Sequence, residues 1–230
     1  SGFEGLELAL PKAATPDAPD VISRATVSTG VIRDGILRTA RTLAAGRGIL
    51  ADRGIDRLTF TPLDWGGLID MGALAEARVS MDEAARALAG AKVPVPPSPG
   101  DFLHLWAGIL DPPTIGQNLL GQKEFTRVIG ALGSGEAALI VMSMGVQSHR
   151  GTDWRQSGLF DRLTIVQGET RWQPTAESYH MVKRLALPDA PTFKEISLFR
   201  LNADPKAGGI DPRRPFDLIV TATRPLTSGG

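Results

Sequence analysis

The spacing of apolar and polar residues predicts both helices and strands in the N-terminal part of the chain. Apolar residues recur every three or four positions over residues 28–46, with charged side chains between them, which is the pattern of an amphipathic helix. Strict alternation over residues 57–61 and 75–80 predicts half-buried strands instead. In the first of these strands, Leu58 and Phe60 are the residues expected to face the core.

A second helix is indicated by the residues at its start. Ser80 followed by Glu83 is a capping box, in which each side chain accepts a hydrogen bond from a free N–H group of the first turn, and Gly90 is expected to end this helix. Prolines then crowd residues 93–100. Their density favours an extended polyproline linker and makes this stretch the best candidate for an internal boundary.

The C-terminal half contains short apolar runs and short helical patterns in mixed order. Prolines at 112 and 113 are placed to begin a helix, and Gln167-Gly168 is a predicted turn. The predicted elements are strands over 102–110, 137–142, 159–166, 195–201 and 216–223, and helices over 114–120 and 125–132. This order predicts an α+β fold with a mixed, largely antiparallel sheet, several short helices and the N-terminal helix described above.

Composition narrows the chemistry that the chain can perform. The formal net charge is zero, so no overall charge draws the chain to nucleic acid or to anionic lipid. The chain has no cysteine, which excludes disulfides, thiolate catalysis and iron–sulfur ligation by its own residues. The longest apolar run, residues 137–142, is too short to span a bilayer. A start without methionine or signal peptide indicates a mature or excised fragment.

The most informative short stretch precedes the predicted N-terminal helix. Taken alone, it is a turn followed by a helix N-cap. A threonine hydroxyl at such a position lies near unpaired backbone N–H groups, which form a ready site for a phosphate. The stretch contains Asp20, Ser23, Arg24, Ala25 and Thr26.

This stretch resembles the acceptor motif of FMN-binding domains that are modified by FAD-dependent flavin transferases. Asp20 matches the leading acid of that motif, and Ser23, Ala25 and Thr26 match its core. The resemblance implies that Thr26 carries FMN through a phosphoester bond. Arg24 departs from the motif, because glycine is commonest at that position. The arginine either strains the backbone there or pairs with the flavin phosphate.

Three further stretches extend the resemblance to about residues 15–224. They are Pro112–Gly121, Gly158–Arg162 and Asp211–Phe216, and they resemble the extracytoplasmic region of the NosR/NirI family. Members of that family are membrane flavoproteins with a periplasmic FMN domain, and they support nitrous oxide reduction through electron supply to the copper reductase or through its maturation. The resemblance implies periplasmic localisation, with a membrane anchor only in the full-length parent.

The resemblance also suggests how the chain is divided. Residues 1–48 would be the C-terminal part of an FMN-binding domain, and residues 49–230 a second extracytoplasmic α+β region that contains the proline-rich linker at 93–100. Only 19 residues precede Asp20, too few for the strands that would shelter the isoalloxazine ring. The flavin of this chain is therefore expected to remain largely in water.

The function expected from these features is that of an electron-transfer flavoprotein module. It is an electron carrier more than a classical enzyme, and no residue is assigned a catalytic role. The implied partners are a flavin transferase and nitrous oxide reductase or its maturation factors, with no nucleic acid contact. The alternative is a docking, sensor or regulatory module without redox chemistry that binds a partner protein.

Other candidate sites have simpler explanations. His149 and Asp153 have helical spacing, but two groups do not complete a metal shell, and no metal site is predicted. Residues 148–155 are rich in hydrogen-bond donors and are either a docking loop, a contact to the flavin edge or a solvated loop. The glycine-rich residues 130–135 lack the lysine of a phosphate-binding loop and are interpreted as a helix end and turn.

Overall fold

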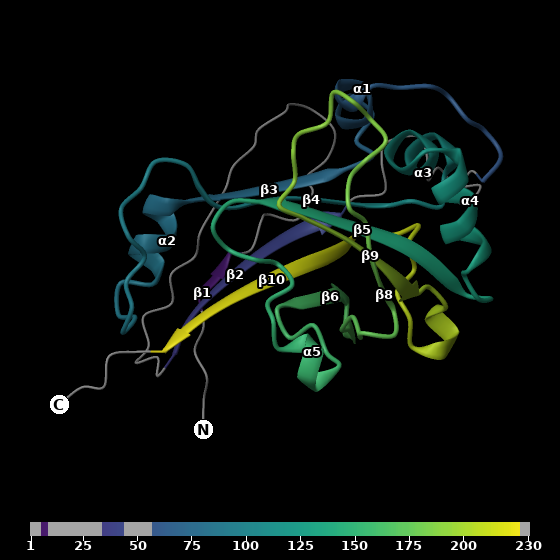
Figure 1. Cartoon of the computed structure of the whole chain (residues 1–230). Helices are drawn as coiled ribbons and strands as arrows, with labels where there is room; N and C mark the ends of the chain where they lie inside the picture. The colour runs from purple at the N-terminus through teal and green to yellow at the C-terminus, as the bar shows by residue number, and fades with distance from the viewer. Residues whose placement is uncertain (1–5, 9–33, 44–56, 226–230) are drawn as a thin grey trace, which may run out of the picture.

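The computed structural model describes residues 6–8, 34–43 and 57–225 (Figure 1). The described strands form two five-stranded sheets. Sheet A has the order β1-β2-β10-β6-β7, and sheet B has the order β3-β4-β5-β9-β8. Among the pairings of these strands, β1 with β2 is parallel and the others are antiparallel. The fold is α+β, as the mixed order of the predicted elements indicated.

Sheet A combines the first two described strands and the last one with a hairpin from the interior of the chain. Its strands are β1 (Leu6–Leu8), β2 (Asp34–Leu43), β6 (Leu163–Gln167), β7 (Thr170–Trp172) and β10 (Phe216–Pro225). The strands of sheet B are β3 (Ala75–Ser80), β4 (Asp101–Ile109), β5 (Glu136–Met144), β8 (Tyr179–Met181) and β9 (Glu195–Asn202). The predicted strand over 137–142 is therefore confirmed as the central strand of its sheet.

The described helices are short. They are α1 (Trp65–Asp70), α2 (Met81–Ala87), α3 (Pro113–Leu120), α4 (Gln122–Gly130) and α5 (Trp154–Ser157), with a 3₁₀ turn at Pro205–Ala207. The predicted capping box is present, since the Ser80 side chain accepts from the Glu83 N–H and the Glu83 side chain accepts from the Ser80 N–H. No helix in the described part of the chain has the length and apolar character needed to cross a membrane.

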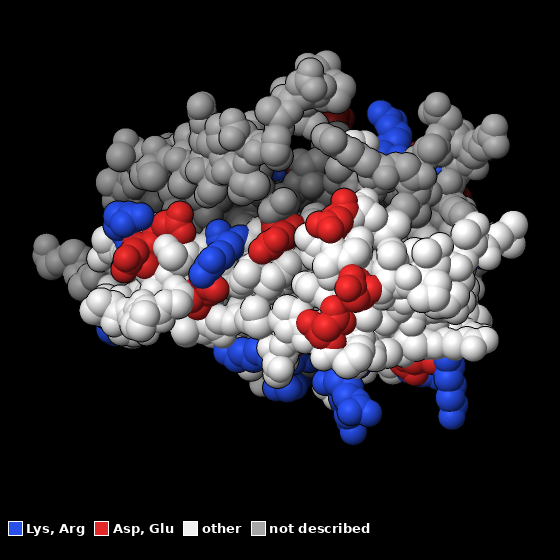
Figure 2. All heavy atoms as spheres, turned by 90° about the horizontal axis from the view of Figure 1, so that it is seen from above, with Lys and Arg blue, Asp and Glu red and all other residues white. Residues whose placement is uncertain are grey.

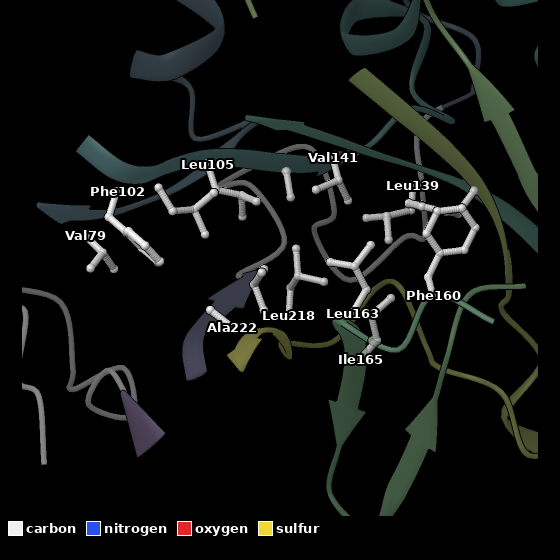
Figure 3. Close-up of a cluster of buried hydrophobic side chains, with 14 of the residues drawn as sticks. Val79, Phe102, Leu105, Leu139, Val141, Phe160, Leu163, Ile165, Leu218 and Ala222 are labelled. Carbon is white, nitrogen blue, oxygen red and sulfur yellow. The ribbon is translucent and has the colours of Figure 1, made fainter. Parts of the chain in front are cut away.

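Two hydrophobic cores lie on opposite faces of sheet B. The first fills the space between the sheets, where Val79, Leu105 and Val141 of sheet B point toward Leu163 and Leu218 of sheet A (Figure 3). The second covers the other face of sheet B, where α1, α3 and α4 pack. The molecule thus has three layers, namely sheet A, sheet B and a layer of helices (Figure 1).

The predicted helix over 28–46 is wrong for the part that the structure describes. Residues 34–43 form β2, and every residue of this strand has a partner on β10, from Asp34 opposite Pro225 to Leu43 opposite Phe216. Threonine and isoleucine in this segment suit a strand as well as a helix face. The long pairing with β10 makes the segment a strand and not a helix. The local pattern of residues contains no information about this partner, which lies far along the chain.

The predicted strand over 57–61 is also absent. The segment has no regular secondary structure, the Leu58 side chain is 93% exposed and Phe60 is 45% exposed. All five residues are exposed, and the segment is held to α3 through backbone atoms, since the Thr61 N–H donates to the Thr114 hydroxyl at 3.1 Å and the Thr59 carbonyl accepts from that hydroxyl at 3.0 Å.

The proline-rich residues 93–100 have no regular secondary structure and connect α2 to β4. The strands on either side, β3 and β4, pair directly with each other, so this connection lies within one sheet. Val95 is buried in the first core, and this packing holds the middle of the segment against the protein. The division of the chain at residue 48 stays a prediction.

The turn at Gln167-Gly168 joins β6 to β7 in a hairpin, with Gln167 opposite Thr170 and Gly168 at a positive φ of 58°. The strand before it is shorter than predicted and begins at Leu163. Residues 159–162, which were predicted to begin this strand, lie outside it. The Phe160 N–H donates instead to the carbonyl of Pro174 at 3.0 Å.

Candidate functional site

The described residues do not include the predicted flavin acceptor motif, which consists of Asp20, Ser23, Arg24, Ala25 and Thr26. The chain that follows the motif enters sheet A at Asp34, which is paired with Pro225 at the last position of β10.

The loop after β5 carries a histidine whose side chain is completely buried. His149 Nδ1 lies 2.6 Å from the Ser143 hydroxyl of β5, and Nε2 lies 2.8 Å from the Ser197 hydroxyl of β9. The backbone N–H of His149 donates to Glu195 at 3.1 Å, and the Ser148 hydroxyl donates to the same carboxylate at 2.7 Å. A hydroxyl both donates and accepts, so the two serines satisfy a neutral imidazole in either tautomer.

Burial controls the ionisation of this group. It lowers the pKa of His149 from 6.5 to about 4, since the surroundings disfavour the charged form, and the charge of Glu195 offsets only part of this effect. Burial also acts to raise the pKa of Glu195, but His149, Ser148 and Arg150 together hold it below its usual range. At neutral pH the histidine is uncharged and fixes the loop to β5 and β9.

The metal interpretation of His149 and Asp153 receives no support from the structure. Both imidazole nitrogens of His149 have hydroxyl partners, and the Asp153 carboxylate instead accepts from the Thr152 hydroxyl at 3.1 Å. Within the described ranges, no three histidine or carboxylate side chains are grouped so that they could hold a metal ion. The histidine serves as an internal anchor of the loop.

An aromatic cluster adjoins this loop. The rings of Trp154 and Phe160 are stacked with centroids 4.9 Å apart and an interplanar angle of 12°. Tyr179 contacts both rings, and Phe160 in turn contacts Phe199 at 5.0 Å. The Arg155 guanidinium lies 5.4 Å from the centre of the Trp154 ring. The segment 148–155 is thus tied to the core by its histidine and its tryptophan, although parts of it remain exposed.

Asp111 is a buried carboxylate next to the Pro112–Gly121 stretch. Its oxygens accept from the Arg57 guanidinium at 2.7 Å and from the Ala138 N–H at 2.8 Å. Burial nevertheless raises the pKa of Asp111 above its ordinary value, because these partners do not fully replace water. The contact joins the segment before α1 to the start of α3 and to β5.

Side chains of α3 hold the same extended segment along its length. The Asn118 amide accepts from the Leu63 N–H at 3.2 Å and donates to the Thr61 carbonyl at 2.8 Å. The Thr114 hydroxyl donates to the Thr59 carbonyl at 3.0 Å. The polar residues of the Pro112–Gly121 stretch therefore organise the packing of residues 57–63 on α3.

The other two stretches that resemble the NosR/NirI family have structural roles as well. In Gly158–Arg162, the phenylalanine belongs to the aromatic cluster and Arg162 donates to the Ser148 carbonyl at 3.2 Å. In Asp211–Phe216, the Asp211 carboxylate accepts from both Arg213 Nε at 2.9 Å and Nη2 at 3.0 Å. Arg213 lowers the pKa of Asp211 through these hydrogen bonds. Both stretches stabilise loops.

A hollow with a volume of about 130 Å³ opens between α4, β8 and β9. Its wall is apolar where α4 faces the sheet, and its rim is basic. The lining includes Val128, Ala131, Leu132, Ala138 and Leu198 on the apolar side and Arg127, His180 and Arg200 at the rim. Both arginines also face a glutamate, since Arg127 pairs with Glu124 and Arg200 Nη1 lies 3.8 Å from Glu136.

Surface charge is unevenly distributed although the total is balanced. Seen from above, aspartate and glutamate side chains lie across the middle of the visible face, and lysine and arginine side chains line its lower edge (Figure 2). That lower edge is the side that faces the viewer in Figure 1. A net charge of zero therefore conceals regions of opposite sign.

Sequence reasoning singled out His149 but missed its burial, and it missed the hollow. A signal for the histidine exists, because Ser143 and Ser197 interrupt two strongly apolar strands and need a buried hydrogen-bond partner. The hollow leaves no comparable signal, since its lining comes from one helix and three separate strands.

Comparison with known proteins gives three relatives. NirI of Paracoccus denitrificans is 59% identical over 228 residues, which are 99% of this chain and 33% of NirI. Regulatory protein NosR of Pseudomonas aeruginosa is 25% identical over 93% of the chain and 31% of its own length, and NosR of Stutzerimonas stutzeri is 28% identical over 89% and 30%.

No protein-family model matches the chain, and no solved structure matches it. The chain spans about a third of the length of the curated relatives it matches. The matched span covers 99% of this chain and therefore extends over all three stretches identified in the sequence. The chain belongs to the NosR/NirI family.

Proposed function

We propose that this chain is the flavin-carrying, extracytoplasmic part of a NosR-like protein and that it transfers electrons in support of nitrous oxide respiration. The observation that carries the proposal is the motif from Asp20 to Thr26, which lies within a chain 59% identical to NirI. The coarser assignment, a role in denitrification as a regulatory or electron-transfer protein, is supported by the NirI and NosR relatives.

In this proposal Thr26 supplies the hydroxyl that is esterified to the FMN phosphate. When bound, FMN supplies the capacity to accept and release electrons, which the side chains of this chain lack. The Asp20 carboxylate orients the motif or assists deprotonation of the threonine, and Ser23 and Ala25 complete the sequence that the transferase recognises. The Arg24 guanidinium is suited to pair with the phosphate.

The described features offer no ready pocket for the isoalloxazine ring. The hollow of about 130 Å³ is well below the roughly 300 Å³ at which ligand pockets begin. The Trp154 ring is stacked on Phe160 and has Arg155 over it, so a flavin would have to displace a present neighbour to stack there. The proposal therefore rests on the motif and on no pocket among the described residues.

The proposal implies two kinds of protein partner. A FAD-dependent flavin transferase attaches the cofactor, and nitrous oxide reductase or one of its maturation factors receives the electrons. The site of action is periplasmic, with a membrane anchor in the full-length parent. The chain has no cysteine, so iron–sulfur clusters in the same electron path would be held by other segments or proteins.

The test is co-expression of the full-length parent with a flavin transferase in a host that exports it. Intact mass is expected to increase by one FMN, and peptide mapping should place it on Thr26. Thr26→Val should abolish the label, while the matched control Thr29→Val should retain it. A flavin found on Ser28 or Thr29, or a Thr26→Val protein that is still labelled, would refute the assignment.

A second candidate function is a docking or regulatory module without redox chemistry. It is favoured by the name of two relatives, Regulatory protein NosR. The two functions separate in the Thr26→Val parent, which cannot carry the flavin. If that colourless protein supports nitrous oxide reduction as well as the labelled wild type, the docking function holds and the electron-transfer proposal fails.

A further inference from the structure

The hollow between α4 and β8–β9 has the size of a single compact group. Its volume of about 130 Å³ is close to the 150 Å³ of an engineered apolar cavity that binds benzene. Val128, Leu132 and Leu198 provide apolar contacts on its wall. A branched aliphatic group or one phenyl ring therefore fits, whereas a flavin, a nucleotide or a folded peptide segment does not.

The rim of the hollow places opposite charges around one nitrogen. His180 Nε2 lies 2.6 Å from Arg127 Nη2 and 3.3 Å from Glu124 Oε1. A guanidinium can only donate and an ionised carboxylate can only accept, so this nitrogen satisfies one of them at a time. The neutral imidazole accepts from Arg127, and the protonated imidazole donates to Glu124.

Protonation of His180 therefore changes what Arg127 can do. Before it, the rim charges balance, since Arg127 pairs with Glu124 and Arg200 with Glu136. After it, the rim has one positive charge in excess, and the nitrogen of His180 no longer accepts from Arg127. One N–H of the Arg127 guanidinium is then released from His180 and can donate to an anionic group at the mouth of the hollow, while Nε and Nη2 stay paired with Glu124.

We propose that this hollow binds a small molecule consisting of a compact apolar group with a carboxylate, and that binding strengthens when His180 takes up a proton. The apolar group fills the space against α4 and β9, and the carboxylate pairs with Arg127. The charged groups that face His180 are Glu124 and Arg127 of α4, and Arg200 of β9 is the remaining charged group of the lining. The proposal is independent of the flavin on Thr26.

The probe is benzoate, titrated into the ¹⁵N-labelled chain at pH 8.0 and pH 6.0. We expect saturable shifts of the amides that line the hollow, and binding at least about fivefold tighter at pH 6.0, the lower end of ordinary coupling between sites. Benzyl alcohol, which has the ring without the charge, should bind weakly and equally at both pH values.

Three variants separate the contributions of Arg127 and His180 to benzoate binding. Arg127→Gln should weaken benzoate at both pH values, and His180→Gln should keep the affinity at pH 8.0 but lose the gain at pH 6.0. The side chains of Arg127 and His180 are 57% and 45% exposed, so neither change threatens the fold. Arg171→Gln, an exposed arginine of the other sheet, is the matched control and should bind as wild type does.

Two results would overturn the proposal. The first is the absence of saturable shifts at the lining residues with benzoate at either pH. The second is binding of benzoate that does not differ from that of benzyl alcohol, or that Arg127→Gln leaves unchanged, because the site would then be an apolar hollow with no anion specificity. A pH dependence that persists in His180→Gln removes the role of this histidine.

Discussion

Acidification should destabilise this protein through His149. In the folded chain burial lowers the pKa of this side chain from 6.5 to about 4, because no water reaches it. Above pH 6.5 the histidine is neutral in both the folded and the unfolded chain, and it contributes nothing to the pH dependence. Below pH 6.5 the unfolded chain binds a proton that the folded chain excludes, so stability falls until the pH reaches about 4.

The expected loss follows from these two pKa values. Integrating the difference in bound protons from pH 7.5 to pH 5.0 gives a loss of about 2 kcal/mol. The full window down to pH 4 corresponds to about 3 kcal/mol, since each pKa unit is worth about 1.4 kcal/mol. For a domain whose total stability is about 5–15 kcal/mol, such a change is easily measured.

The assay is urea unfolding followed by tryptophan fluorescence at pH 7.5 and pH 5.0, for the wild type and for His149→Gln. Glutamine can hydrogen-bond to Ser143 and Ser197 but takes up no proton. The wild type should lose about 2 kcal/mol more than the variant between the two pH values. Titrating groups that His149 does not contact are shared by both proteins and largely cancel, and Glu195, whose pKa is held below its ordinary value, titrates mostly below pH 5.0. Equal pH dependence in the two proteins would refute the reasoning.

Three further predictions concern packing, flavin attachment and a helix cap. Gly116→Ala should destabilise the chain by about 1–3 kcal/mol in urea unfolding, because a Cβ at this position would overlap the Phe125 ring; unchanged stability would mean that α3 and α4 are less closely packed. Asp20→Ala should slow attachment of FMN to Thr26 in a timed mass-spectrometric assay without altering the unfolding midpoint, and equal rates would leave the aspartate without a role. Ser80→Ala should cost about 1 kcal/mol through loss of the capping box, which the same urea assay measures.

Part of the candidate chemistry was accessible from the sequence alone. The acceptor motif is a short linear pattern, so the residue types and their spacing suffice to propose that Thr26 carries FMN. The three stretches that resemble the NosR/NirI family are also linear, and the similarity to NirI supports the family assignment. How the motif residues are arranged in space stays a prediction, because they lie outside the described ranges.

Elements with local causes could be predicted from the residues alone. The Ser80–Glu83 capping box, the helix that begins at Pro113 and the apolar strand β5 depend on neighbouring residues, and the structure confirms all three. Tertiary structure decided the rest. Residues 34–43 became a strand because β10 supplies a partner for every one of them, and no local pattern indicates a partner so far along the chain. His149 lost its charge for the same kind of reason, since two strands and a loop close around it and remove the water that an ionised imidazole needs.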